Sequence, residues 1–235
     1  MLQIKTIGLI GGMSWESTQE YYKLLNCGVK EKLGGLNSAK IILHSLNFEE
    51  IAKMQSVEDW KTLEKTMINS AQKLENAGAD FVLICTNTMH KLADQVETAI
   101  KIPLIHIADA TADSIKNKKI TKVGLLGTKF TMEQAFYKDR LKEKHGIDVV
   151  IPTDSDRQII HDVIYNELCL GEIREDSKKE YLRIINNLVK LGAQGIVLGC
   201  TEIPSLIKQD DVNSSIIIFD TTQIHANYAL KQALE

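Results

Sequence analysis

An internal repeat is the feature of this sequence that most restricts its fold. Three segments recur in the same order: IKTIGLIGG (4–12) as ITKVGLLGT (120–128), AGADFVLICTNT (77–88) as LGAQGIVLGCTE (191–202), and PLIHIADAT (103–111) as IIIFDTT (216–222). Aligned on Gly8 and Gly124, Gly78 and Gly192, and Asp109 and Asp220, the copies are separated by 116, 114 and 111 positions. Nearly constant separations predict two halves of similar fold, formed by duplication.

Each half alternates short apolar runs with amphipathic segments. The apolar runs cover 4–10, 40–46, 81–85 and 104–107 in the first half, and 122–127, 148–151, 195–199 and 215–219 in the second. Runs of this length, separated by helix-like segments, are typical of buried strands in parallel sheets. We therefore expect an α/β protein with two similar parallel-sheet domains, related by a pseudo-two-fold duplication, and an active site in the cleft between them.

The helix pattern sets the expected domain boundaries. Apolar residues recur at helical spacing in 56–78 and 180–192, and each segment ends at a glycine. A last helix near 222–234 follows the second half and is expected to pack back on the first. The predicted domains are residues 1–115 with the helix 222–235, and residues 116–221.

Composition restricts the class of protein. The chain has 235 residues, 44% of them hydrophobic and 25% charged, with a net charge of -3, which favours a soluble globular protein over a nucleic-acid-binding one. No apolar run is long enough for a membrane span, and no signal-peptide pattern opens the chain, so we expect a cytoplasmic protein. Its four cysteines have no metal-binding spacing, which favours reduced thiols and no bound metal.

Three polar loops follow predicted strands: GGMSWES (11–17), CTNTMH (85–90) and GCTEIP (199–204). Ligands of parallel α/β sheets bind beyond the carboxyl ends of strands, so these loops are the expected binding region. Ser14 is a candidate helix N-cap, and the N–H groups beside it could bind a carboxylate. His90 is expected to be a loop or core histidine rather than a catalytic one.

The repeat distinguishes two cysteines. At a separation of 114, Cys200 is equivalent to Thr86, whereas Cys85 is equivalent to Gly199. Neighbouring strand residues point to opposite faces, so Cys85 is expected to be a buried packing residue. Cys200 is expected beside N–H groups of the following segment, which would lower its thiol pKa and favour a thiolate base or nucleophile.

The motifs GLIGGMSWEST, TNTMHK, HIADAT and GCTEI together resemble the aspartate/glutamate racemase superfamily, in its aspartate racemase branch. The resemblance covers nearly the whole chain. It implies a racemase without a cofactor, in which two cysteines exchange protons on opposite faces of the substrate Cα. Carried over by position, the second-half cysteine is Cys200, and Thr86 stands in place of the first.

The resemblance also implies a set of residues that contact the substrate: Met13, Gln55, Asn87, Thr88, Thr201 and Glu202. Many family members hold the distal carboxylate with an arginine and a lysine. The equivalent positions here are Gln55 and Cys169, which leaves a neutral polar amino acid as a competing substrate. The expected partner is a small-molecule amino-acid substrate, with no nucleic acid and no membrane, and a homodimer is left open.

Three functions remain from the sequence. The first is an amino-acid racemase acting on aspartate or glutamate, or on a broader set of amino acids. The second is a decarboxylase of the same fold, which needs one cysteine to reprotonate a carbanion. The third is an amino-acid binding protein that has lost catalysis with the first cysteine.

Overall fold

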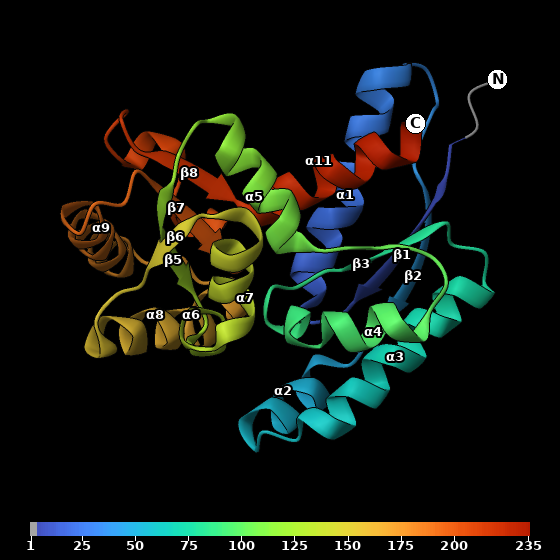
Figure 1. The fold of residues 1–235 in the computed structure, drawn as a ribbon, viewed down its shortest axis with the longest axis horizontal. Coiled ribbons are helices and arrows are strands. Elements are labelled where there is room, and N and C mark those ends of the chain that lie inside the picture. Colours follow the sequence, from blue (N-terminus) through green and yellow to red (C-terminus); the bar gives the residue numbers. More distant parts are fainter. Residues whose placement is uncertain (1–3) are drawn as a thin grey trace. The chain divides into compact units, whose positions relative to one another are not determined.

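The computed structural model describes residues 4–235 (Figure 1). By its internal contacts the chain divides into two compact units. Unit 1 contains the described residues up to Ile107 together with His225–Glu235, and unit 2 is Ala108–Ile224. The chain thus passes into unit 2 several residues before the domain boundary predicted at 115, and returns shortly after the one predicted at 221. Residues 1–3 of the predicted first domain lie outside the described part.

Each unit contains one parallel sheet of four strands. In unit 1 the strands are β1 (Thr6–Gly11), β2 (Lys40–Ser45), β3 (Phe81–Ile84) and β4 (Leu104–Ile105), in the order β2-β1-β3-β4. In unit 2 they are β5 (Lys122–Gly127), β6 (Asp148–Val150), β7 (Gly195–Gly199) and β8 (Ile217–Asp220), in the order β6-β5-β7-β8. All eight predicted strands are present, and the predicted α/β fold class is confirmed.

Strand register confirms the repeat and corrects its third landmark. Ile7 pairs with Phe81 in unit 1, as Val123 pairs with Gly195 in unit 2, which reproduces the separations of 116 and 114. Along the last strands, Leu83 pairs with Ile105 and Val197 pairs with Phe219, again 114 positions apart.

The equivalence of Asp109 and Asp220, drawn from similar letters at a separation of 111, is therefore wrong. The counterpart of Asp220 is His106. The two aspartates also differ in their contacts. Asp220 accepts hydrogen bonds from the backbone N–H groups of Thr222 and Gln223, whereas Asp109 accepts side-chain bonds from a neighbouring helix.

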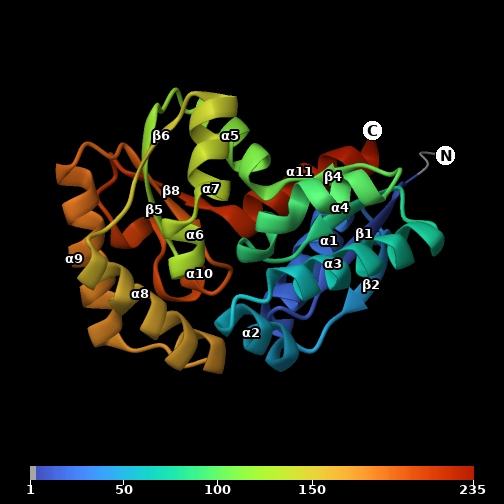
Figure 2. The same ribbon diagram turned by 60° about the horizontal axis from the view of Figure 1, so that its bottom comes forward.

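Helices cover both faces of the sheet in unit 1. They are α1 (Trp15–Leu33), α2 (Phe48–Ser56), α3 (Trp60–Asn76), the 3₁₀ turn η1 (Thr88–Leu92), α4 (Ala93–Ala99) and the larger part of α11 (Thr221–Leu234). Alternate strand residues point to opposite faces, so Leu9 packs in one apolar cluster and Ile10 in the other. Figure 2 shows α3 and α4 side by side.

The predicted final helix is α11. Ala229 and Leu230 of this helix share an apolar cluster with Leu25 of α1, which confirms that it packs on the first half. The helix predicted over 56–78 is α3, which begins four residues later than predicted, after α2 has ended at Ser56. Glu58 has φ +56, which breaks the helical path, and the Asp59 side chain then caps α3 by accepting from the Thr62 N–H at 3.1 Å.

The helical segments of unit 2 are α5 (Ile107–Asn117), α6 (Lys129–Glu133), α7 (Ala135–Asp139), the π-helix η2 (Arg140–Lys144), α8 (Asp154–Asn166), η3 (Leu168–Leu170), α9 (Glu175–Lys190), α10 (Ile203–Leu206) and η4 (Gln209–Asp211). The predicted helix at 180–192 lies within α9 and its C-terminal glycine turn. Among the helices of residues 4–235, none has both the length and the apolar character to cross a membrane.

Candidate functional site

The loop after β1 is held in one conformation by its own side chains. Gly12 has φ +83, and a Cβ there would lie 2.1 Å from the carbonyl oxygen of Leu46, so only glycine fits. The Thr18 hydroxyl accepts from the Gly12 N–H at 2.8 Å and donates to the Ser14 carbonyl at 2.9 Å. Ser14 caps α1, as predicted, by accepting from the Ser17 N–H. Carboxylate binding beside Ser14 stays a prediction.

The loop after β3 lies beside the loop after β1 in unit 1. Ser17 links them, because its hydroxyl reaches both the Ser14 carbonyl at 3.0 Å and the Cys85 carbonyl at 3.2 Å. Thr86 is half-buried at this position, and the next two residues, Asn87 and Thr88, are buried. Ser17 was not among the predicted site residues, since its sequence context indicated only a helix start.

Two other predicted contacts lie in the same part of unit 1. Gln55, on α2, is only 4% exposed, and its Nε2 donates to the sulfur of Met89 at 3.2 Å. Met13 and Met89 belong to one apolar cluster. The structure thus brings Met13 and Gln55 to the chain that follows Thr86, and it places an uncharged amide there.

Cys85 is a packing residue, as predicted. Its side chain is fully buried in an apolar cluster with Leu9 and Leu83, and its N–H continues the sheet by donating to the Ile10 carbonyl at 2.9 Å. Burial raises the pKa of the Cys85 thiol far above its ordinary value. A thiol without water or a base beside it is chemically inert.

Cys200 follows β7 in unit 2, at the position that is equivalent to Thr86. Its thiol donates to the Glu202 Oε2 at 3.0 Å, and the Thr201 hydroxyl donates to the same oxygen at 2.7 Å. Cys200 is 8% exposed, whereas Thr201 and Glu202 are half-buried. The structure thus brings together the three residues predicted on this loop.

The predicted low pKa of Cys200 is wrong. Burial raises the pKa of this thiol well above its usual value, and the Glu202 carboxylate and Cys169 raise it further. The backbone N–H of Glu202 lowers the pKa, but this is the smallest effect. The resting group is therefore a protonated thiol beside a proton acceptor, not a free thiolate.

Tyrosines complete the surroundings of Cys200. The pKa of Tyr165 is raised by burial first and then by Cys200, Cys169 and Glu202. Burial is also the first cause that raises the pKa of Tyr181, and the same thiols raise it further. The Tyr181 hydroxyl is occupied, because it donates to the Ile160 carbonyl at 3.1 Å. Sequence reasoning did not include Tyr165, which lies on α8 with no motif to mark it.

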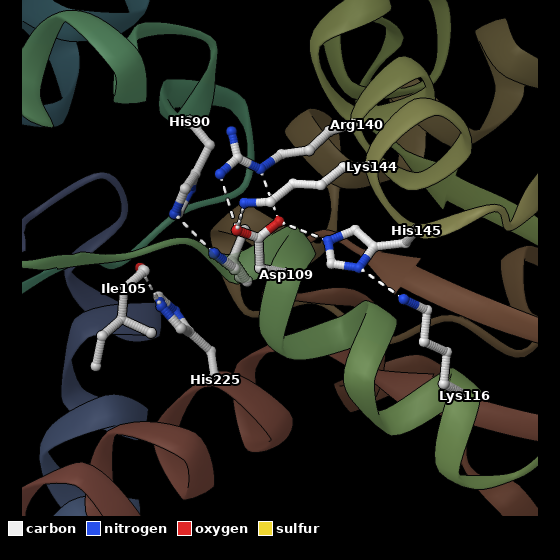
Figure 3. A network of polar contacts seen from close by, with 9 residues as sticks. His90, Ile105, Asp109, Lys116, Arg140, Lys144, His145 and His225 are labelled. Atoms are coloured by element: carbon white, nitrogen blue, oxygen red, sulfur yellow. Dashed lines mark hydrogen bonds and ion pairs between the residues drawn. The ribbon is translucent and has the colours of Figure 1, made fainter.

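The HIADAT motif contributes a charged cluster at the first turn of α5 (Figure 3). Arg140 contacts both carboxylate oxygens of Asp109 at 2.8 Å, and Lys144 and His145 donate to it at 2.7 and 2.8 Å. Burial raises the pKa of Asp109, but the bonds from these three residues lower it more, so the net pKa is well below its ordinary range. The cluster anchors α5 within unit 2.

His90 has no ring nitrogen to offer a substrate. Its Nδ1 lies 2.7 Å from the Thr86 carbonyl oxygen, and its Nε2 lies 3.1 Å from the backbone nitrogen of Ile107. The side chain is 2% exposed. These contacts confirm a core histidine, and they also connect it to a predicted site residue.

In this duplicated α/β fold a buried thiol follows one central strand, and a threonine stands at the equivalent place after the other. The sequence pattern of the family described as Asp/Glu/hydantoin racemase matches residues 10–229. The chain belongs to this family, and it is a racemase.

Relatives agree with this assignment. The chain is 26% identical over 168 residues to the broad specificity amino-acid racemase RacX of Bacillus subtilis, covering 70% of this chain and 69% of that protein. A proposed Asp/Glu racemase of Yersinia pestis has a solved structure with 53% identity and a TM-score of 0.92, covering 99% of this chain and 100% of that one. An aspartate racemase homologue of Pyrococcus horikoshii has 37% identity and a TM-score of 0.86, with the same coverage.

Proposed function

We propose that the protein racemises an amino acid, with aspartate and glutamate as the first candidates, without a cofactor. Cys200 removes the α-proton from one face, and Thr86 lies on the opposite face of the substrate. The observation that carries this proposal is the strand register, because it makes Thr86 and Cys200 equivalent positions after two equivalent strands. Two such positions in a duplicated fold can supply the two faces that racemisation requires.

Glu202 gives Cys200 its basic form in this proposal. A protonated thiol cannot take a proton, so it first transfers its own to the Glu202 Oε2, which lies 3.0 Å away. The thiolate then removes the α-proton, and the electron pair of the C–H bond delocalises into the substrate carboxylate. Glu202 releases its extra proton to water.

Reprotonation from the other face completes the reaction. A threonine hydroxyl is a much weaker acid than a thiol, whose reference pKa is about 8.5, so Thr86 or a water it orients delivers the proton slowly. That proton comes from solvent and balances the one released by Glu202. Inversion therefore places a solvent hydrogen at Cα.

The proposed site residues restrict the identity of the substrate side chain less than they restrict the reaction. Gln55 supports aspartate or glutamate by donating from its amide, but it supports an uncharged polar side chain equally well. The name of the Bacillus subtilis relative, a broad specificity racemase, favours the wider range. A second candidate is therefore a racemase of neutral polar amino acids.

The test is proton exchange in D2O. Both enantiomers of each amino acid are incubated with the protein, and loss of the α-proton signal is followed by NMR. Exchange that disappears in Cys200→Ser and persists in Cys27→Ala, at an exposed cysteine, supports the proposal. Release of CO2 would instead indicate a decarboxylase, and no exchange with any amino acid would leave only binding.

The protein's need for cofactors is tested in the same assay. The proposed steps use side chains and water, so dialysis against a chelator and removal of pyridoxal phosphate should both leave the exchange rate unchanged. Dependence on either would contradict the mechanism.

A further inference from the structure

The imidazole of His90 bonds to the protein backbone at both of its nitrogens. His90 lies on η1, four residues after Thr86, and is buried in unit 1. Nδ1 meets the carbonyl oxygen of Thr86. Nε2 meets the N–H of Ile107 (Figure 3). One side chain thus joins the loop after β3 to the first residue of α5.

The two partners determine the protonation of this ring. A carbonyl oxygen can only accept a hydrogen bond, so Nδ1 carries a hydrogen and donates it to Thr86. A backbone N–H can only donate, so Nε2 is unprotonated and accepts from Ile107. His90 is therefore neutral and in the Nδ1–H tautomer.

The bond to Thr86 fixes the loop where the sheet no longer does. β3 ends at Ile84, so the carbonyl of Thr86 lies beyond the strand. The neighbouring carbonyls are also held, since Ser17 donates to that of Cys85, and the His90 N–H donates to that of Asn87 at 3.1 Å. His90 contributes two of these three bonds, and its ring sets the plane of the peptide between Thr86 and Asn87.

The bond to Ile107 is matched by a second histidine. His225 Nε2 donates to the carbonyl of Ile105 at 2.9 Å, and its Nδ1 accepts from the Tyr21 hydroxyl at 2.8 Å. The rings of His90 and His225 are 5.7 Å apart, edge to face. Two neutral imidazoles therefore hold residues 105–107 from both sides, directly before the chain passes into unit 2.

We propose that His90 is a positioning residue for Thr86. Its Nδ1–H bond orients the Thr86 peptide and with it the hydroxyl that faces the substrate, while its Nε2 ties this loop to the start of α5. The inference rests on the proposed function, because it assigns Thr86 a role in proton transfer. A packing role would depend only on the volume of the ring, whereas the positioning role depends on the separate bonds that Nδ1 and Nε2 make.

Two substitutions separate the two bonds. In His90→Asn the side-chain amide lies near the place of Nδ1 and can donate to the Thr86 carbonyl, but it does not reach Ile107. In His90→Gln the longer side chain places its amide oxygen near Nε2, where it can accept from Ile107, but the bond to Thr86 is lost. Both variants remove the ring, so they share its packing loss.

The expected result is a difference in turnover between these variants. His90→Asn keeps kcat for α-proton exchange within about threefold of the wild type, whereas His90→Gln lowers kcat by about tenfold to a hundredfold, with KM nearly unchanged, because small displacements of a reacting group are costly. Thermal melts of both variants serve as the folding control. Equal losses in kcat would overturn the positioning role and leave only packing.

A spectroscopic measurement tests the tautomer without activity. Nitrogen-15 spectra of the wild-type imidazoles at neutral pH should show one ring, absent from His90→Asn, with a protonated Nδ1 and an unprotonated Nε2. The Nε2–H form or a charged ring would overturn the inference, even if both variants are unstable. If the wild type exchanges no amino acid, the proposed function fails and the role for Thr86 fails with it. If it exchanges normally but the variants lose activity equally, only the inference fails.

Discussion

The thiol of Cys200 donates a hydrogen bond to the Glu202 carboxylate at 3.0 Å, and the Thr201 hydroxyl donates to the same oxygen. This oxygen is therefore an acceptor with two donors. The arrangement makes Glu202 more than a neighbour in sequence, because a buried thiol needs a proton acceptor before it can act as a base.

The first prediction concerns that acceptor. Glu202→Gln keeps the shape of the side chain and an oxygen that can accept from the thiol, but an amide cannot take the proton. We expect kcat for α-proton exchange to fall by about a hundredfold or more, in the range of lost general-base catalysis, with a small change in KM. The measurement is steady-state exchange in D2O.

Glu202→Asp provides the control for this prediction. A shorter carboxylate can still accept a proton, so the variant should retain more activity than Glu202→Gln. If the amide variant is as active as the wild type, Glu202 is not the acceptor.

The second prediction separates the two buried cysteines. Cys200→Ala should abolish exchange with little effect on stability, because Cys200 lies at the end of a strand. Cys85→Ala should retain exchange and lose about 1–2 kcal/mol of unfolding free energy, since it leaves a small cavity in the core. Urea unfolding and the exchange assay check both. An inactive but folded Cys85→Ala beside an active Cys200→Ala would reverse the assignment.

The third prediction concerns stability at low pH. Burial lowers the pKa of His225 from 6.5 to about 4, although its bond to the Ile105 carbonyl raises it slightly. Below pH 6.5 the unfolded chain protonates this histidine while the folded one does not, so the folded state loses stability as the pH falls. Between pH 6.5 and 4 this group costs about 3 kcal/mol, and above pH 6.5 it costs nothing.

The matched variant for this prediction is His225→Gln. It is less stable than the wild type at every pH, because it loses the contacts of the ring, but it has no group that titrates. The difference in unfolding free energy between wild type and variant should shrink as the pH falls from 6.5 to 4. A constant difference over this range would show that His225 does not titrate as proposed.

The sequence predicted the strands and the pairing of loops well, because both depend on local patterns. Apolar runs mark buried strands in any parallel sheet. The repeat made Thr86 the equivalent of Cys200, and the strand registers agree with this equivalence. The start of α3 was predicted four residues too early, and α2 was not predicted, since the boundary between them depends on the backbone of Glu58 and the cap formed by Asp59.

Side-chain direction explains the remaining errors. The sequence places Glu202 two residues after Cys200 but shows neither the burial of the thiol nor the turn of the carboxylate back to it. Burial first, and the carboxylate second, reverse the expected pKa shift of Cys200. His90 was correctly predicted as a core residue, yet its partner Ile107 lies 17 positions away and contributes only a backbone N–H. Such a contact leaves no pattern in the amino-acid sequence.

The last prediction concerns the direction of the reaction. In the superfamily this chain resembles, the second-half cysteine acts on the L-enantiomer, and that residue is kept here as Cys200, with Thr86 in place of its partner. We therefore expect an L-amino acid, aspartate or glutamate first, to exchange its α-hydrogen much faster than the D-form. A thiol with a carboxylate to receive its proton is a far better base than an unassisted hydroxyl.

Equilibrium limits what this bias can mean. The two enantiomers have equal free energies in an achiral medium, so kcat/KM for racemisation is the same in both directions. The bias therefore appears in α-hydrogen exchange, because Cys200 can remove and return a hydrogen on one face of the L-form without inversion. Thr86→Cys should restore a thiol on the other face and speed exchange of the D-form, with little change for the L-form. Thr86→Ser, which keeps a hydroxyl, is the control and should leave the D-form slow. The measurement is α-proton loss in D2O for each enantiomer. Equal rates in the wild type, or no gain for the D-form in Thr86→Cys, would show that Thr86 does not occupy the place of the second base.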